Sequence, residues 1–218
     1  MSIRFTDTLR VAAGDQWDRV INHKFTKELA AGTIDRNVLK KYLIQDHRFL
    51  DAFVVLLASM VAKARCLSDR LPGCQFLAVI TGKENTYFER CFEKLGGCSE
   101  EERNSIPNDE CTSGFAKLMR DAANGSLGEC LAVLVVCEWS YLSWGQKVID
   151  STIRDDFVTY EWVDLHSGEF FEEVIKYLRG LLDKEGGLID EAEKKKCTER
   201  FLQAVELEEQ FFDNAYKQ

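Results

Sequence analysis

The sequence predicts one all-α domain, a helical bundle over residues 1–218, and three observations support this class. Apolar residues recur at helical spacing along nearly the whole chain, and no short alternating run bounded by turn residues suggests a strand. Only two of the 218 residues are proline, Pro72 and Pro107, which favours long uninterrupted helices. Repeats, low-complexity linkers and breaks in composition are also missing, so we expect a single core.

Eight helices follow from this periodicity, separated by residues that typically end or begin helices. Gly32 is a natural stop for the first helix, and Asp35 is a candidate N-cap for the second. Gly96-Gly97 closes the third helix, while Asn124-Gly125-Ser126 and Glu185-Gly186-Gly187 separate later helices. The expected helices cover residues 6–31, 35–64, 76–95, 99–103, 108–123, 127–153, 157–182 and 189–217.

The sixth expected helix contains the most informative stretch of the chain, residues 131–144. This stretch is almost wholly apolar, yet it carries the thiol of Cys137 and the carboxylate of Glu138 in its middle. A helix that is apolar on all sides is a buried core helix, and a buried carboxylate must be paired, hydrogen-bonded or neutralised. The apolar run is too short and too interrupted to predict a membrane span.

Two further carboxylates lie on apolar helical faces, Asp46 in the second helix and Glu208 in the last. A single carboxylate in this setting more often makes a structural hydrogen bond. Three of them on three helices, counting Glu138, favour a shared polar pocket lined by Phe or Trp. Together with Cys137 and Tyr141, such a pocket suits the binding of an amine-bearing heterocycle and proton transfer to it.

Several other classes of function are disfavoured. The net charge of −9 argues against a nucleic-acid partner, because phosphate must be neutralised by Lys and Arg. Cys-x-x-Cys pairs, Glu-x-x-His motifs and Gly-rich phosphate loops are missing, so we expect no metal and no cofactor. The chain shows no signal peptide, so we expect a cytoplasmic protein with reduced cysteines and no membrane partner. A Cys–His nucleophile pair, with His166 near Cys137, stays open.

Three segments resemble the TenA/thiaminase II family, in order along nearly the whole chain. They are Tyr42-Leu-Ile-Gln-Asp-His-Arg-Phe-Leu50, then Glu129-Cys-Leu-Ala-Val-Leu-Val-Val-Cys-Glu-Trp-Ser-Tyr141 followed by Gly145-Gln-Lys147, and Phe201-Leu-Gln-Ala-Val-Glu-Leu-Glu-Glu-Gln-Phe-Phe212. The resemblance implies an all-helical haem-oxygenase-like fold without haem, and a homodimer or homotetramer. It also implies action on the aminopyrimidine half of thiamin.

The resemblance implies a role for individual residues of this chain. Asp46 stands where the family binds the amino group and ring nitrogen of the pyrimidine. Cys137 falls on the family's nucleophilic cysteine, Tyr141 on the tyrosine one turn later, and Glu208 on the catalytic glutamate of the last helix.

Three positions depart from the better-known branch of the family. Phe49 and His166 stand at or near positions where that branch has a Tyr, and they are expected to bind substrate. Glu138 replaces a Tyr beside the cysteine, which makes it a third candidate catalytic residue. These substitutions resemble a second branch, which includes the plant seed-maturation-type proteins and is described as dispensing with the cysteine nucleophile.

The expected function is therefore a cofactor-free hydrolase of thiamin salvage. It would convert an aminomethyl-pyrimidine to hydroxymethyl-pyrimidine, with the N-formyl precursor as a further substrate. One alternative is thiaminase II, which cleaves intact thiamin. Another is a non-enzymatic pyrimidine-binding or regulatory protein of the same fold, although three core carboxylates are more than a simple binder needs.

Overall fold

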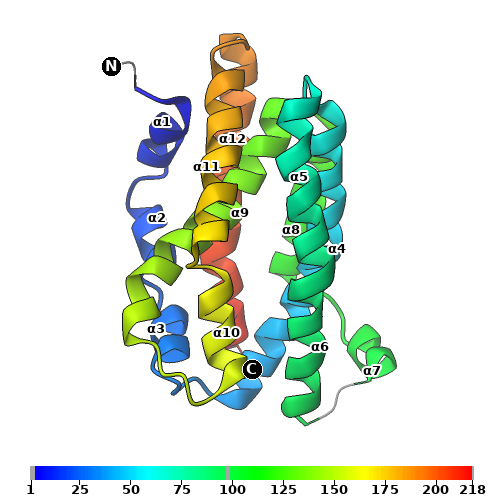
Figure 1. Ribbon diagram of the computed structural model, residues 1–218, viewed down its shortest axis with the longest axis vertical. Helices are drawn as coiled ribbons and strands as arrows, with labels where there is room; N and C mark the ends of the chain where they lie inside the picture. Colours follow the sequence, from blue (N-terminus) through cyan, green and yellow to red (C-terminus); the bar gives the residue numbers. More distant parts are fainter. Residues whose placement is uncertain (1–2, 97–98, 218) are drawn as a thin grey trace.

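The computed structural model describes residues 3–96 and 99–217, and all regular structure within those ranges is helical, which confirms the predicted all-α class. That residues 1–218 form one domain stays a prediction. The helices run from α1 beside the N-terminus to α12, and the chain ends near the opposite end of the molecule (Figure 1). The elements are α1 Phe5–Ala12, α2 Gly14–Ile21, α3 Lys24–Ala30, α4 Arg36–Lys63, α5 Leu67–Val79, the π-helical segment η1 Ile80–Glu84, α6 Asn85–Lys94, α7 Glu100–Ser105, α8 Glu110–Asn124, α9 Leu127–Val148, the 3₁₀ turn η2 Ile149–Ser151, α10 Phe157–Leu165, α11 Glu169–Gly186 and α12 Glu191–Ala215.

Helix α9 is the centre of the core, as its sequence predicts. Every residue from Leu127 to Glu138 is buried, and the helix packs against α4, α8, α11 and α12. Figure 1 shows α9 crossing the molecule obliquely among these helices. The helix and the turn after it, Leu127–Ser151, are long and apolar enough to span a membrane. However, 83% of the apolar window is buried against the rest of the protein, as in the core helix of a soluble protein.

The N-terminal region differs from the single helix expected over residues 6–31. It forms three short helices, because Gly14 adopts a φ of +54°, which a continuous helix does not allow. A second break falls at His23, whose ring nitrogen accepts a hydrogen bond from the Phe25 N–H and thereby caps α3. The predicted stop at Gly32 is confirmed, since this residue has a φ of +65° just after α3.

The third expected helix, residues 76–95, begins earlier than predicted. Helical structure starts at Leu67 and continues to Lys94, with Pro72 inside α5. Leu67 and Leu71 are exposed, so this first part has no apolar face to reveal it in the sequence. The predicted stop at Gly96-Gly97 is consistent with Gly96, which has a φ of +100°, while Gly97 lies outside the described residues.

The expected helix over residues 157–182 is interrupted, and the interruption matters for the site. Helix α10 ends at Leu165, and α11 begins only at Glu169. The backbone of His166 lies against α9 at Gly145, where a Cβ would stand 2.4 Å from the His166 carbonyl oxygen. A residue without a side chain at 145 therefore lets the turn that carries His166 pack directly on the core helix.

The remaining helix starts follow their capping residues. Asp35 accepts hydrogen bonds from the N–H groups of Asn37 and Val38, as predicted for an N-cap. Capping boxes begin α7 at Ser99 and α9 at Ser126. These local signals explain why most helix starts were predictable within a few residues.

Candidate active site

One cavity gathers six of the seven candidate residues from three parts of the fold. It has an empty volume of about 310 Å³, which includes space open to solvent. Phe49 and Trp162 supply aromatic walls. The cavity is lined by Asp46 and Phe49 of α4, Glu84 of η1, Cys137, Glu138 and Tyr141 of α9, Trp162 of α10, and His166 after α10.

The seventh candidate, Glu208 of α12, lies behind Cys137 rather than on the cavity wall. Its carboxyl group is close enough to the Cys137 thiol for a hydrogen bond, and only 2% of the residue is exposed. One oxygen, Oε1, has no hydrogen-bond partner among the described residues. Burial raises the pKa of Glu208 well above its usual value, with a further contribution from the charge of Asp46.

The pKa values of the carboxyl groups that line the cavity are also raised, which favours their protonated forms. Burial raises the pKa of Asp46 to about 7, although the Tyr42 hydroxyl partly offsets this. Burial raises the pKa of Glu138 well above the usual range, and the charges of Glu84, Glu208 and Asp46 add to the effect. A carboxyl group with a raised pKa keeps its proton to a higher pH and can act as a general acid, one of the roles that acid–base catalysis requires.

Asp46 combines deep burial with an unused acceptor. Only 6% of the residue is exposed, and its Oδ2 has no hydrogen-bond partner among the described residues. An unpaired buried oxygen of this kind is unfavourable unless a ligand or water fills the position. Asp46 is therefore placed to bind a group that donates hydrogen bonds.

Cys137 is a thiol rather than a thiolate at neutral pH. Burial raises the pKa of Cys137 well above its usual value, and the charges of Glu208 and Glu138 raise it further. A nucleophilic cysteine usually lies beside a positive charge that lowers its pKa, whereas the main charged neighbours of Cys137 are carboxyl groups. Cys137 can therefore act as a nucleophile only if a neighbouring base, for which Glu208 is placed, removes its proton as it reacts.

His166 is a neutral hydrogen-bonding group in this cavity. Its Nδ1 lies 2.7 Å from the carbonyl oxygen of Trp162, so Nδ1 carries the proton and Nε2 is left as an acceptor. Burial lowers the pKa of His166 to about 4. No hydrogen bond joins His166 to Cys137 in the described part of the chain, so the geometry does not favour a Cys–His pair.

Tyr141 connects the cavity to a buried hydroxyl pair. Its hydroxyl oxygen lies 2.7 Å from that of Tyr42, and both residues are buried. The Tyr42 hydroxyl is in turn close enough to Asp46 to affect its pKa. The two tyrosines thus fix the Asp46 side of the cavity through hydrogen bonds that need no solvent.

Sequence reasoning missed Glu84 and Trp162 of the cavity wall. Glu84 has Lys83 and Asn85 as neighbours, which is the pattern of an exposed face. Glu84 ends a π-helical segment, whose wider turn rotates its residues relative to an α-helix, so α-helical spacing assigns them to the wrong face. Trp162 was not predicted to line the cavity, because a buried aromatic residue in a helix is usually part of the core.

The site holds no arrangement typical of a metal centre. Across residues 3–96 and 99–217, no group of three or more His, Cys, Asp and Glu side chains is placed to hold a metal ion. The seven cysteines in those ranges are free thiols, while Cys98 lies outside them.

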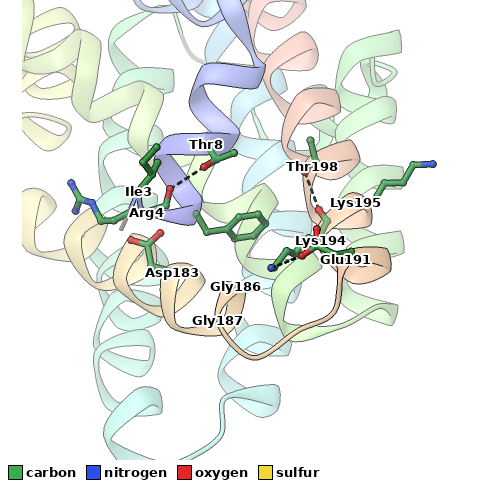
Figure 2. A pocket seen from close by; sticks show the side chains of 11 residues that line it. Ile3, Arg4, Thr8, Asp183, Gly186, Gly187, Glu191, Lys194, Lys195 and Thr198 are labelled. Carbon is green, nitrogen blue, oxygen red and sulfur yellow. Dashed lines mark hydrogen bonds and ion pairs between the residues drawn. The ribbon is translucent and has the colours of Figure 1, made fainter. Parts of the chain in front are cut away.

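A second, larger pocket lies near the N-terminus, between the start of α1, the end of α11 and the start of α12 (Figure 2). Its empty volume is about 1240 Å³, and it is open to solvent. Figure 2 shows that some of its polar side chains bond to one another or to the nearby backbone, and Lys194 donates to Glu191 at 2.7 Å. None of the described residues that line this pocket has a buried unpaired oxygen like Oδ2 of Asp46, so its size alone does not indicate a ligand.

Comparisons with known proteins point to the same family throughout the chain. The model of the TENA/THI-4/PQQC family matches residues 12–218. An aminopyrimidine aminohydrolase of Halalkalibacterium halodurans is 27% identical over 216 residues, covering 98% of this chain and 96% of that protein. The aminopyrimidine aminohydrolase of Bacillus subtilis is 25% identical over 218 residues, covering 99% of this chain and 91% of that protein.

Solved structures share the fold over its full extent. A TenA homologue from Pyrococcus furiosus has a TM-score of 0.86 at 26% identity, covering 97% of this chain and 100% of that chain. A TenA family transcription regulator from Silicibacter has the same TM-score at 22% identity, covering 97% and 96% of the two chains. The second likeness, at this lower identity, concerns the fold alone.

Proposed function

The chain belongs to the TENA/THI-4/PQQC family, and on this premise we propose that it is a hydrolase of thiamin salvage. It converts an aminomethyl-pyrimidine and water to hydroxymethyl-pyrimidine and ammonia. The observation that carries the proposal is the small aromatic-walled cavity, in which Asp46 has a buried unpaired oxygen and Glu138 a raised pKa. Relatives that match this chain over nearly its full length are named aminopyrimidine aminohydrolases.

The cavity suits an aminopyrimidine ring. Near neutral pH the Asp46 carboxyl group exists in both protonation states, because its pKa is about 7. Its protonated form donates to a ring nitrogen while its other oxygen accepts from the adjacent amino group. The aromatic side chains of Phe49 and Trp162 offer apolar faces on which a planar ring packs.

The carboxyl groups supply the proton transfers of the hydrolysis. As water attacks the exocyclic carbon, the carbon–nitrogen bond breaks and its electron pair leaves with the amine as ammonia. A carboxylate accepts a proton from the attacking water, and a protonated carboxyl group donates a proton to the substrate. Glu138 and Glu208 both have raised pKa values: the charges of Glu208 and Asp46 contribute to that of Glu138, and the charge of Asp46 contributes to that of Glu208. The roles of acid and base can therefore be divided between them.

Finer features of the activity are part of the proposal. The N-formyl precursor is a further substrate, and the pocket residues Phe49, Glu138 and His166 support a relationship to the plant seed-maturation-type branch. The protein acts in the cytoplasm as a homodimer or homotetramer. The free thiols of the described cysteines support a reducing compartment.

Substrate comparison tests the proposed function. The purified protein is incubated separately with aminomethyl-pyrimidine, its N-formyl derivative and intact thiamin, and the release of hydroxymethyl-pyrimidine is measured by liquid chromatography. We expect the aminomethyl-pyrimidine to have the highest kcat/KM. A higher kcat/KM for intact thiamin would identify a thiaminase II instead, and tight binding without turnover of any substrate would indicate a binding or regulatory protein.

Turnover is expected to survive metal chelation and to need no added cofactor. The cavity carboxyl groups provide the acid and the base, and three-residue ligand clusters are not found among residues 3–96 and 99–217. The measurement is the rate of ammonia release before and after dialysis against EDTA, with protein dialysed without EDTA as the reference. Loss of the rate with EDTA and its recovery with one particular metal would contradict this prediction.

A further inference from the structure

Glu84 lines the cavity but has no part in the reaction described above. It is the last residue of the π-helical segment η1, between α5 and α6, and its side chain is half-buried. Such π-helical turns inside longer helices are frequent at functional sites. The neighbouring groups that face Glu84 across the cavity include Asp46 of α4, Glu138 of α9 and His166.

The cavity has a surplus of acidic groups and no compensating positive charge. None of the residues that line it is Lys or Arg, and His166 is neutral. Asp46, Glu84 and Glu138 make no salt bridge with any residue in the described ranges. Glu208, behind Cys137, adds a fourth carboxyl group without such a partner. Buried carboxylates without a cation are unfavourable, so a positively charged ligand would stabilise this arrangement.

Glu84 is electrostatically coupled to the proposed catalytic groups. Among charged neighbours, Glu84 contributes most to the raised pKa of Glu138, ahead of Glu208 and Asp46. Burial raises the pKa of Glu84 itself to about 8, with the charge of Asp46 as the second cause. Glu84 and Glu138 line the same cavity, in which Glu84 is more exposed than the deeply buried Asp46.

We infer that Glu84 binds the positively charged exocyclic amine of the substrate and is thereby a specificity-determining residue. The inference rests on the proposed function and names the group that distinguishes substrate from product. Glu138 and the half-buried Glu84 line the same cavity as Asp46, so they are available to the exocyclic amine of a ring that Asp46 holds. A carboxylate–ammonium hydrogen bond is of the charge-assisted kind, and it is stronger than a neutral one.

This arrangement favours substrate over product. The aminomethyl group is a cation near neutral pH, and it neutralises part of the surplus negative charge in the cavity. The hydroxymethyl group of the product is neutral and offers no such compensation. Glu84 is thus expected to strengthen substrate binding selectively, and product leaves more easily once ammonia has been lost.

Direct binding measurements test the inference. Dissociation constants of aminomethyl-pyrimidine and hydroxymethyl-pyrimidine are measured by calorimetry on the wild type, Glu84→Gln, Glu84→Asp and Glu93→Gln. Glu93 is the matched control, because it is an exposed acid of the same helical segment and its substitution changes the net charge equally. Circular dichroism establishes that each variant is folded.

We expect Glu84→Gln to weaken binding of the amine about 10-fold or more, the range of a lost charge-assisted hydrogen bond. Binding of the alcohol is expected to change less than about 2-fold, and Glu84→Asp should fall between wild type and Glu84→Gln. Wild-type affinity for the amine should rise between about pH 6 and about pH 8, as Glu84 loses its proton, and this rise should flatten in Glu84→Gln.

The outcomes separate the inference from the proposed function. If amine and alcohol lose affinity equally in Glu84→Gln, or if neither changes, the inference is wrong, whether or not the wild type turns over. If the wild type binds the amine through Glu84 but releases no ammonia, the inference holds and the proposed hydrolysis fails.

Discussion

Glu208→Gln is expected to lower kcat about 10²-fold or more while leaving KM for the amine nearly unchanged. The amide keeps the size of the side chain but cannot give or take a proton, and Glu208 is placed to do both beside Cys137. Because Glu208 lies behind the cavity wall, its loss affects the chemical step more than the binding of the ring. Steady-state kinetics of ammonia release measure both parameters.

Two comparisons sharpen this prediction. Glu206→Gln, at an exposed position of α12, is the matched control and should keep wild-type kinetics. Asp46→Asn should instead mainly raise KM, because an amide presents a donor where the amino group of the ring also donates. A Glu208→Gln enzyme that keeps a normal kcat would remove Glu208 from the proposed chemistry.

Glu138→Gln is expected to abolish most of the amine-releasing activity, while Cys137→Ser retains most of it. The physical reason is the protonation state of each group. Cys137 is buried among carboxyl groups that raise its pKa, so the thiolate is scarce. Glu138 lines the same cavity, and its raised pKa suits a carboxyl group that gives a proton to the substrate. The division of labour is measured from kcat/KM of both variants on the same substrates.

The opposite result has a clear signature. If Cys137 is the nucleophile, Cys137→Ser loses turnover of every substrate, and a pyrimidine–thiol adduct is trapped on the wild type by mass spectrometry. In that case Glu208 must act as the base that deprotonates the thiol. A Glu138→Gln enzyme with wild-type rates beside an inactive Cys137→Ser enzyme would show that the carboxylate mechanism is wrong.

The candidate residues were identifiable from sequence because each stands out against an apolar helical face. Glu138 is the clearest example, a single carboxylate within a buried helix. Asp46 and Glu208 followed from the same contrast, and the structure places all three at or beside one cavity. Their roles in catalysis and binding stay predictions until the variants are measured.

The sequence by itself determined the all-α class, the buried helix α9, the capped starts of most helices and the positions of three buried carboxylates. These features depend on periodicity and on contacts within one or two helical turns, so short segments of the sequence are enough to predict them. Only the tertiary structure decided that Glu84 faces the cavity, that Trp162 forms its wall and that His166 lies in a break between helices. Those outcomes depend on a π-helical turn and on the close approach of His166 to Gly145, which bring together residues far apart in sequence.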